Sequence, residues 1–209
     1  HVDRVYARLG QLRAEAEAMR ARSYEHGREA TPEALFERDV AVYHANRTLQ
    51  VLDAESEGLV FGRLDMANGD VIYIGRLGIR DAQFNNLVVD WRAPMAAAFY
   101  QATPENPLGV VRRRVIRCSR QQVIDISDDL LDPANAPEDM RVVGEGALMA
   151  ALSRSRGDSM RNIIATIQKE QDEAIRAPEN GVTEITGGPG TGKTAVALHR
   201  AAYLLYRER

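Results

Sequence analysis

The sequence predicts a mixed α/β fold with three successive parts: an N-terminal antiparallel helical hairpin, a small antiparallel β module, and the beginning of an α/β domain. Apolar residues first recur at the three- and four-residue spacing of helices, and then alternate as they do in strands. A glycine-rich segment near the end of the chain stands between a short apolar run and a second helical pattern. We place the hairpin at residues 1–58, the β module at 59–126, an acidic connector with a short helix at 127–158, and the start of the α/β domain at 159–209.

The composition is that of an ordinary globular protein and argues against several classes of function. Of 209 residues, 44% are hydrophobic and 27% are charged, and the net charge of −3 gives no overall basic field of the kind that attracts nucleic acid. The single cysteine, Cys118, excludes an internal disulfide and a cysteine-based metal site. No apolar run approaches the roughly 18 residues of a membrane helix, and the first residues do not resemble a signal peptide. We therefore expect a cytoplasmic protein without a membrane partner.

Two helices with matching apolar stripes are predicted at the N-terminus. They cover residues 2–26 and residues 32 to about 57, and Thr31 followed by Pro32 is typical of a helix start. The stripes contain Val2, Val5, Leu9, Leu12, Ala16 and Met19 in the first helix, and Leu35, Val42, Ala45, Leu49 and Leu52 in the second. A break this short predicts an antiparallel hairpin, which we expect to protrude from the β module.

The β module is predicted from six runs of strand-like residues. Asn68 and Gly69 lie between the first two runs, and this dipeptide is the strongest short signal for a β-hairpin. The predicted strands are 59–66, 71–77, 86–91, 95–101, 110–117 and 121–126. We expect these residues to form the core of the module by themselves. Residues 127–139 are interpreted as a connector and 139–153 as a short helix.

The segment 187–194 matches the phosphate-binding pattern G-x-x-x-x-G-K-[ST] at every position. Glycines let the loop turn so that backbone N–H groups face a phosphate, and the following helix points its positive end at the same anion. In this pattern Lys193 contacts the β- and γ-phosphates of ATP, and the hydroxyl of Thr194 binds Mg²⁺. The predicted nucleotide-binding residues are Gly187, Gly188, Pro189, Gly190, Thr191, Gly192, Lys193 and Thr194. A helix over 159–177, a strand over 182–186 and a helix over 192–207 complete the expected start of a RecA-like α/β domain.

One concentrated basic patch leaves two interpretations open. It consists of Arg112, Arg113, Arg114, Arg117 and Arg120. Residues of a strand alternate between its faces, so these side chains cannot all line one groove. We favour a solvated edge strand whose charges prevent aggregation over contacts to phosphate or to an acidic partner.

Two smaller groups are interpreted as structural or receive no role. Trp91 lies between Asp90 and Arg92, and we favour a core tryptophan beside an Arg–Asp pair over a ligand site. His26, His44 and His199 have no co-ligands at metal-binding spacing and receive no role.

Gln171 lies in the predicted helix that leads, through a short strand, into the phosphate loop. This arrangement resembles the Q motif of superfamily 1 helicases, in which the matching glutamine reads the adenine edge because its amide both donates and accepts hydrogen bonds. The resemblance adds Gln171 to the predicted nucleotide-binding residues.

Longer stretches of the sequence resemble the HelD family. Its members are RNA polymerase-associated, helicase-like ATPases of Gram-positive bacteria. The specific stretches are Val71 to Gly78, with its Tyr-Ile-Gly-Arg sequence, and Val88 to Pro94, with its Asp-Trp-Arg sequence, followed by Phe99 and Tyr100. The resemblance covers essentially the whole chain. It implies a hairpin directed into the secondary channel of core RNA polymerase, a small domain before the first RecA-like domain, and ATP-linked release of polymerase from nucleic acid.

The family pattern also implies that the chain is an N-terminal piece. The catalytic set is incomplete, because the acids that hold Mg²⁺ and position water, the arginine finger and the second RecA-like domain are missing. We therefore expect no ATP hydrolysis by this piece alone, and we expect contacts to nucleic acid through the missing motor domains. Two alternatives stay open: a superfamily 1 DNA helicase or repair motor with an N-terminal extension, and a partner-binding module with a vestigial nucleotide site.

Overall fold

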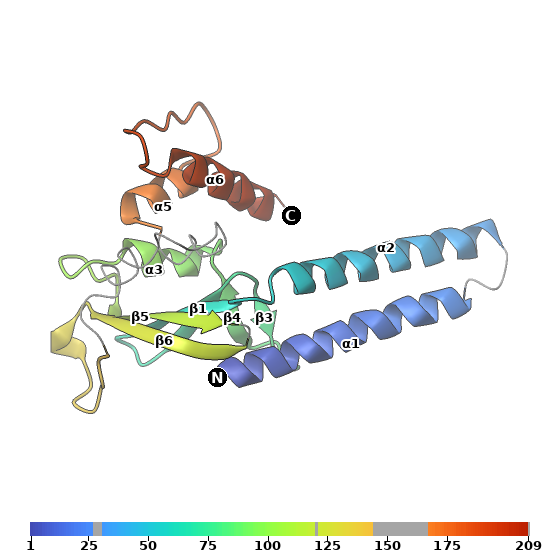
Figure 1. The fold of residues 1–209 in the computed structure, drawn as a ribbon, viewed down its shortest axis with the longest axis horizontal. Coiled ribbons are helices and arrows are strands. Elements are labelled where there is room, and N and C mark those ends of the chain that lie inside the picture. The colour runs from blue at the N-terminus through green and yellow to red at the C-terminus, as the bar shows by residue number, and fades with distance from the viewer. Residues whose placement is uncertain (27–30, 120, 144–166, 209) are drawn as a thin grey trace.

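The computed structural model describes residues 1–26, 31–119, 121–143 and 167–208. Within these residues the chain forms a long helical hairpin, one six-stranded sheet and a final pair of helices, which confirms the predicted fold class. In Figure 1, helices α5 (Lys169–Arg176) and α6 (Lys193–Arg207) lie over the sheet, and the short helix α3 (Ala97–Gln101) lies between them and the strands. None of the described helices combines the length and the apolar character needed to cross a bilayer.

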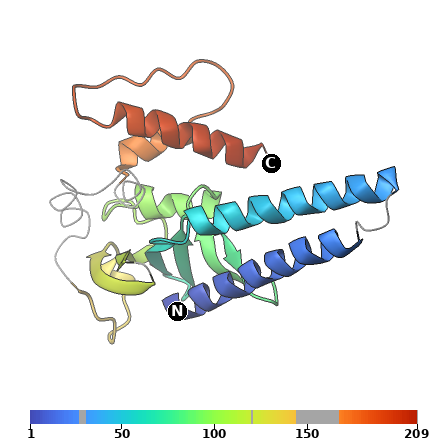
Figure 2. The same cartoon turned by 45° about the vertical axis from the view of Figure 1, so that its right-hand side comes forward.

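The hairpin consists of helix α1 (Val2–His26) and helix α2 (Pro32–Ala54), and it projects well beyond the sheet (Figures 1 and 2). The hydroxyl of Thr31 accepts a hydrogen bond from the N–H of Ala34 and so caps the start of α2, with Pro32 at the first helical position as predicted. At about 1.5 Å per residue, α1 is about 37 Å long. The hairpin is therefore a thin rod fixed to the sheet at one end.

The seam between the two helices is largely the predicted one. Its best buried side chains include Ala16 on α1 and Ala45, Leu49 and Leu52 on α2. Met19, which was expected to face the seam, is 48% exposed. Buried seam residues along the distal part of the hairpin therefore come mainly from α2, with Ala16 contributed by α1.

Six strands form one sheet within the described residues, in the order β3-β4-β2-β1-β5-β6. They are β1 (Val60–Met66), β2 (Val71–Gly75), β3 (Ile79–Arg80), β4 (Asn86–Asp90), β5 (Val110–Ser119) and β6 (Gln122–Leu130). Strands β1 and β2 pair antiparallel across the predicted Asn-Gly turn. Strands β2 and β4 are parallel neighbours, and the other pairs are antiparallel. The sheet is thus largely antiparallel, as predicted.

Both faces of the central strands are buried, each by a different part of the chain. Successive side chains of a strand point to opposite faces, and accordingly Val88 and Val89 belong to different apolar clusters. The cluster under α3, α5 and α6 includes Phe61, Leu64, Ile74, Val89, Trp91, Phe99, Ile175, Val196 and Tyr203. The cluster under the base of α1 includes Val5, Tyr6, Leu59, Val60, Ile79, Leu87, Val88 and Ile116.

The expectation that residues 59–126 form the core of the β module alone is therefore wrong. Val5 is fully buried in the second cluster. The hydroxyl of Tyr6 donates a hydrogen bond to the carbonyl of Ser56 at 3.0 Å and accepts one from the N–H of Leu59 at 3.3 Å. The first turns of α1 belong to the core of the sheet, and only the distal part of the hairpin projects.

Residues 95–101 form helix rather than the predicted strand. Pro94 opens a 3₁₀ turn (Pro94–Ala96) that continues directly into α3. Proline suits the first turn of a helix because its N–H would be unpaired there, and the alanines that follow favour helix. The helix carries Phe99 onto the sheet, where its ring meets Phe61 edge to face with centroids 5.8 Å apart.

Other element boundaries also differ from the prediction. Strand β6 continues to Leu130, into the expected connector, because it pairs with β5 along that length. Residues 182–186 are not a strand, since none of the described strands pairs with them and Val182 is 99% exposed. The helix predicted over 159–177 has its described helical part at Lys169–Arg176, and residues 139–143 are not helical. Residues 144–166, which hold the remainder of both predicted helices, lie outside the described residues.

Gly75→Ala should destabilise the protein, whereas Gly10→Ala should stabilise it slightly. A Cβ atom on Gly75 would meet the backbone oxygen of Leu59 and lie 2.6 Å from Cγ1 of Val88, and such overpacking lowers the free energy of unfolding by about 1–3 kcal/mol. Around Gly10, on an exposed part of α1, a Cβ would meet nothing within 4 Å, so alanine should add about 0.5–1 kcal/mol. Urea unfolding curves of both variants test this, and equal midpoints would contradict it.

Candidate nucleotide-binding site

The phosphate loop leads directly into α6, as the sequence pattern requires. Gly192 is the N-cap residue of the helix, with φ of 84°, and Gly190 has φ of 78°. Both values lie in the left-handed region that glycine adopts without strain. These two glycines therefore stand where the loop must turn into the helix.

Lys193 folds back onto the loop that precedes it. Its Nζ atom donates hydrogen bonds to the carbonyl oxygens of Gly187 at 2.8 Å and Gly188 at 2.6 Å. The hydroxyl of Thr191 donates to the same Gly188 oxygen at 2.9 Å. Lys193 and Thr194 are exposed, so the loop holds a positive charge and a hydroxyl where an anion from solvent can reach them.

The residues of this loop fit the phosphates of ATP and an associated Mg²⁺ ion. Among the residues that the structure describes, no side chain caps the start of α6, so the N–H groups of its first turn keep their capacity to bind an acceptor. The positive end of the helix dipole adds to the charge of Lys193, which is the first residue of α6. Thr194, in the first turn, offers the oxygen ligand that Mg²⁺ prefers.

Gln171 contacts the loop directly. Its Nε2 atom donates to the carbonyl oxygen of Thr191 at 3.2 Å, and its Oε1 atom accepts from the N–H of Gln168 at 3.1 Å. Gly192 is the close neighbour of this amide, since a Cβ there would lie 2.9 Å from Nε2. The structure thus brings together the glutamine and the loop, which the sequence predicted to share one site.

The helix that carries Gln171 is anchored on its other side by a buried ion pair. Asp172 is fully buried and accepts from Nε of Arg176 at 2.8 and 3.0 Å and from the amide of Gln101 at 2.7 Å. Burial raises the pKa of Asp172, and Arg176 and Gln101 act in the opposite direction. This pair was not predicted from the sequence, although Asp and Arg four residues apart on a helix are a recognisable signal.

The remaining donors of Arg176 reach the turn after strand β4. Nη2 donates to the carbonyl oxygen of Trp91 at 2.6 Å, and Nη1 donates to those of Arg92 and Ala93 at 3.2 and 3.3 Å. The same turn is closed by Asp90, whose carboxylate accepts from the side chain of Arg92 at 2.6 and 2.8 Å. Trp91 is 3% exposed, which confirms the interpretation as a core tryptophan beside an Arg–Asp pair.

Helix α6 rests on this turn as well. The ring of Trp91 meets that of His199 edge to face with centroids 5.5 Å apart, and the guanidinium of Arg92 lies 4.8 Å from the ring centroid of Tyr206. From α6, Arg200 donates to the carbonyl oxygens of Ala174, Ile175, Ala177 and Pro178 at the end of α5. His199, which received no role from the sequence, therefore helps to join α6 to the turn after β4, and Arg200 joins α6 to the end of α5.

The arginine patch is not the solvated edge strand that we favoured. Strand β5 lies between β1 and β6, and its arginines pair with carboxylates of those neighbours. Arg112 meets Asp65 at 2.8 Å, Arg113 meets Asp129 at 2.8 Å, and Arg114 meets Asp128 at 2.6 Å. The acidic partners of these three arginines thus belong to the same sheet. Arg117 lies 4.0 Å from Asp125, and Arg120 lies outside the described residues.

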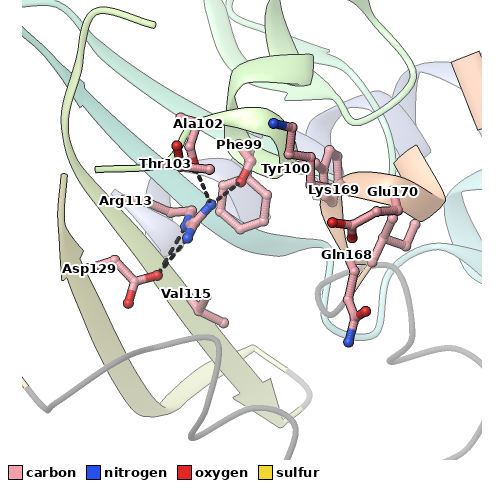
Figure 3. Close-up of a pocket in the computed structure, with 11 residues that line it drawn as sticks. Phe99, Tyr100, Ala102, Thr103, Arg113, Val115, Asp129, Gln168, Lys169 and Glu170 are labelled. Carbon is pink, nitrogen blue, oxygen red and sulfur yellow. Dashed lines mark hydrogen bonds and ion pairs between the residues drawn. The ribbon is translucent and has the colours of Figure 1, made fainter. Parts of the chain in front are cut away.

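A cavity of about 370 Å³ lies between α3, strands β5 and β6, and the start of α5 (Figure 3). The guanidinium of Arg113 on its wall is directed to Asp129 and to the carbonyl oxygens of Phe99 and Ala102. No residue of the phosphate loop lines it. This cavity is therefore distinct from the nucleotide site, and its arginine is committed to internal contacts.

Two protein-family models match successive parts of the chain. The family model of the N-terminal domain of DNA helicase IV HelD matches residues 1–141, which is more than half of the chain. The chain belongs to the HelD family. The hairpin and the whole described sheet lie within the region that matches the HelD N-terminal domain. No individual curated protein gives a match.

A second family model, the UvrD/REP helicase N-terminal domain, matches residues 167–209. This segment contains α5, Gln171, the phosphate loop and α6. It is the start of a superfamily 1 helicase-type ATPase domain, a class that generally uses ATP and Mg²⁺. The boundary between the two matched regions falls between the sheet and α5.

Asp128→Asn should destabilise the fold strongly, whereas Asp39→Asn should not. The Asp128 side chain is fully buried and accepts from two nitrogens of Arg114 and from the N–H of Val143, so neutralising it leaves buried positive charge uncompensated. Removing one partner of a buried pair costs about 3–5 kcal/mol, whereas an exposed pair such as Arg38–Asp39 contributes about 1 kcal/mol or less. Urea unfolding of both variants measures the difference. Equal losses would show that the arginine pairs of β5 are not buried as described.

Proposed function

We propose that the chain is the N-terminal part of an ATP-driven, helicase-like factor that binds core RNA polymerase near its secondary channel and helps to release or recycle polymerase from nucleic acid. The observation that carries the proposal is the form of the hairpin: a thin rod, anchored in the sheet and projecting from it. Such a factor would act in the cytoplasm, where bacterial polymerase works. We assign its contacts with nucleic acid to motor domains beyond this chain.

An exposed apolar stripe on the hairpin supports a role in protein docking. Phe36, Val40 and Tyr43 follow one another at spacings of four and three on α2 and are 71%, 40% and 59% exposed. They lie on the side of α2 opposite to the buried residues Ala45 and Leu49, which face α1. Aromatic residues are enriched in protein interfaces, so this stripe suits a partner that surrounds the rod.

The nucleotide site supports the energy source of the proposed factor. Bound Mg·ATP would supply the free energy of hydrolysis for the movement of polymerase. On the side of this chain, Lys193 and the first turn of α6 would hold the phosphates, Thr194 would hold the metal ion, and Gln171 would contact the adenine edge.

A DNA-unwinding motor is the second candidate, because residues 167–209 match the UvrD/REP helicase domain. The two candidates differ in what stimulates ATP hydrolysis by the full-length protein. Stimulation by core polymerase favours the first, and unwinding of a tailed duplex without polymerase favours the second.

Lys193→Ala in the full-length protein should weaken Mg·ATP binding by about ten- to one-hundredfold. The change removes a charge-assisted phosphate contact of about 1.5–3 kcal/mol. Lys169→Ala is the matched control, because Lys169 is the other lysine of the chain and is likewise exposed. Calorimetric titration with a non-hydrolysable ATP analogue compares the two variants. Unchanged affinity in Lys193→Ala would remove the phosphate loop from the proposal.

Removing the distal hairpin should weaken binding to core RNA polymerase by at least about tenfold while ATP binding is retained. Arg13 pairs with Asp53, and Arg20 donates to Asn46, so residue 16 lies opposite residue 50 in this register. Replacing residues 17–49 with a short glycine-rich turn therefore keeps Val5 and Tyr6 in the core of the sheet. The affinity is measured by titrating the full-length protein over core polymerase that is immobilised on a surface.

A double substitution tests the exposed apolar stripe of α2 without shortening the hairpin. Phe36→Ser with Tyr43→Ser should lower polymerase affinity with the hairpin intact, and Glu37→Ser, an exposed neighbour on α2, should not. If the shortened hairpin binds polymerase as well as the parent protein does, the docking role belongs to the sheet or to the motor.

A further inference from the structure

Helix α5 is too short to set its own position. It has eight residues, and a helix of that length is not stable in isolation. Its orientation therefore comes from the side chains that it buries, above all Ile175 and Asp172, both fully buried. Gln171 is the direct neighbour of Asp172, so whatever fixes Asp172 also fixes the glutamine at the nucleotide loop.

Arg176 is the group that ties this helix to the sheet domain. Its guanidinium joins Asp172 to three successive carbonyl oxygens, those of residues 91–93, over distances of 2.6 to 3.3 Å. It lies 5.4 Å from the ring centroid of Tyr203 on α6 and 6.0 Å from that of Tyr100 on α3. A planar fork with five donors makes this set of contacts, and an ammonium group cannot reproduce it.

Burial of the Asp172–Arg176 pair indicates a role in geometry. The side chains are 0% and 10% exposed, and desolvation offsets much of the attraction between two charges buried in this way. What the pair supplies is a fixed direction for α5, with Gln171 on the loop side and the turn 91–93 on the other. Displacement of a binding group by about 1 Å is enough to weaken its contacts severely.

We propose that Arg176, acting with Asp172, is a positioning residue for nucleotide recognition, through which the HelD-type domain sets the adenine selectivity of the helicase-type segment. The inference rests on the proposed function, because it takes the loop at 187–194 as an ATP site. It adds that Gln171 is held in place from outside the ATPase segment, by the turn after strand β4. The turn 90–93, distant from the loop in sequence, thereby becomes part of the nucleotide-binding apparatus.

The test compares the affinities of the full-length protein for ATP, GTP and inorganic tripolyphosphate, each with Mg²⁺, by calorimetric titration. The Gln171→Ala variant gives the reference value: the ratio of ATP to GTP affinity that remains when the adenine contact is removed. Arg176→Gln should reduce the preference for ATP over GTP by about fivefold or more, toward the Gln171→Ala value, since one lost hydrogen bond corresponds to about this factor. Affinity for tripolyphosphate should change by less than about twofold, because Lys193 and the loop are untouched.

Two further variants serve as control and as second test. Tyr100→Phe removes a buried hydroxyl that has no hydrogen-bond partner among the described residues, next to the same helix, and should leave the ATP to GTP ratio unchanged. Arg176→Lys keeps the charge beside Asp172 without the fork and should give an intermediate ratio. If Arg176→Gln does not fold, Arg176→Lys decides the question.

The outcomes separate the inference from the function on which it rests. A parental ATP to GTP ratio in Arg176→Gln, with the ratio lost in Gln171→Ala, overturns the positioning role and leaves the ATP site standing. Equal losses of ATP and tripolyphosphate affinity in a folded Arg176 variant also overturn it, because the defect would then lie in the loop. Absence of ATP binding by the parental protein, or an unchanged ratio in Gln171→Ala, overturns the assigned nucleotide site and the inference with it.

Discussion

The central strands of the sheet carry apolar side chains on both faces, and the arrangement of the whole molecule follows from the need to cover them. One face is covered by Val5 and Tyr6 from the first turns of α1, and the other by Phe99 from α3 together with residues of α5 and α6. Helix α1 comes from the start of the chain and α5 and α6 come from its end, whereas α3 comes from its middle. Consequently the projecting hairpin and the nucleotide segment are fixed to opposite sides of the same sheet.

Charged groups inside this architecture define position more than they add stability. Strand β5 is held in register with its neighbours by arginine pairs to Asp65, Asp128 and Asp129. At the other face, Arg176 joins α5 to the turn after β4. A buried charge accepts few arrangements of its neighbours, so such pairs exclude alternative registers and tilts. Apolar contacts alone would tolerate more of them.

Sequence patterns correctly predicted the elements that depend on a few adjacent residues. The cap at Thr31, the Asn-Gly turn and the phosphate loop each depend on a few adjacent residues, and all three have the expected geometry. Helix α3 was mistaken for a strand because its apolar run has no clear period, although Pro94 marked its start. The pairing of β5 was missed since it depends on matching Arg112–Arg114 with acids across a hairpin. Arg176 could not be assigned because its partners at 91–93 are remote in sequence.

The length of the hairpin has a mechanical consequence. Because the base of α1 is packed into the sheet, a rotation of the sheet relative to α6 carries the rod with it. Over about 37 Å, a tilt of about 5° moves the far end by about 3 Å, close to the width of an atom-to-atom contact. The rod starts at the base of α1, which is packed into the sheet, and extends away from it along the hairpin (Figure 2). A rotation that is small at the base of α1 is therefore large enough to make or break contacts along the distal hairpin.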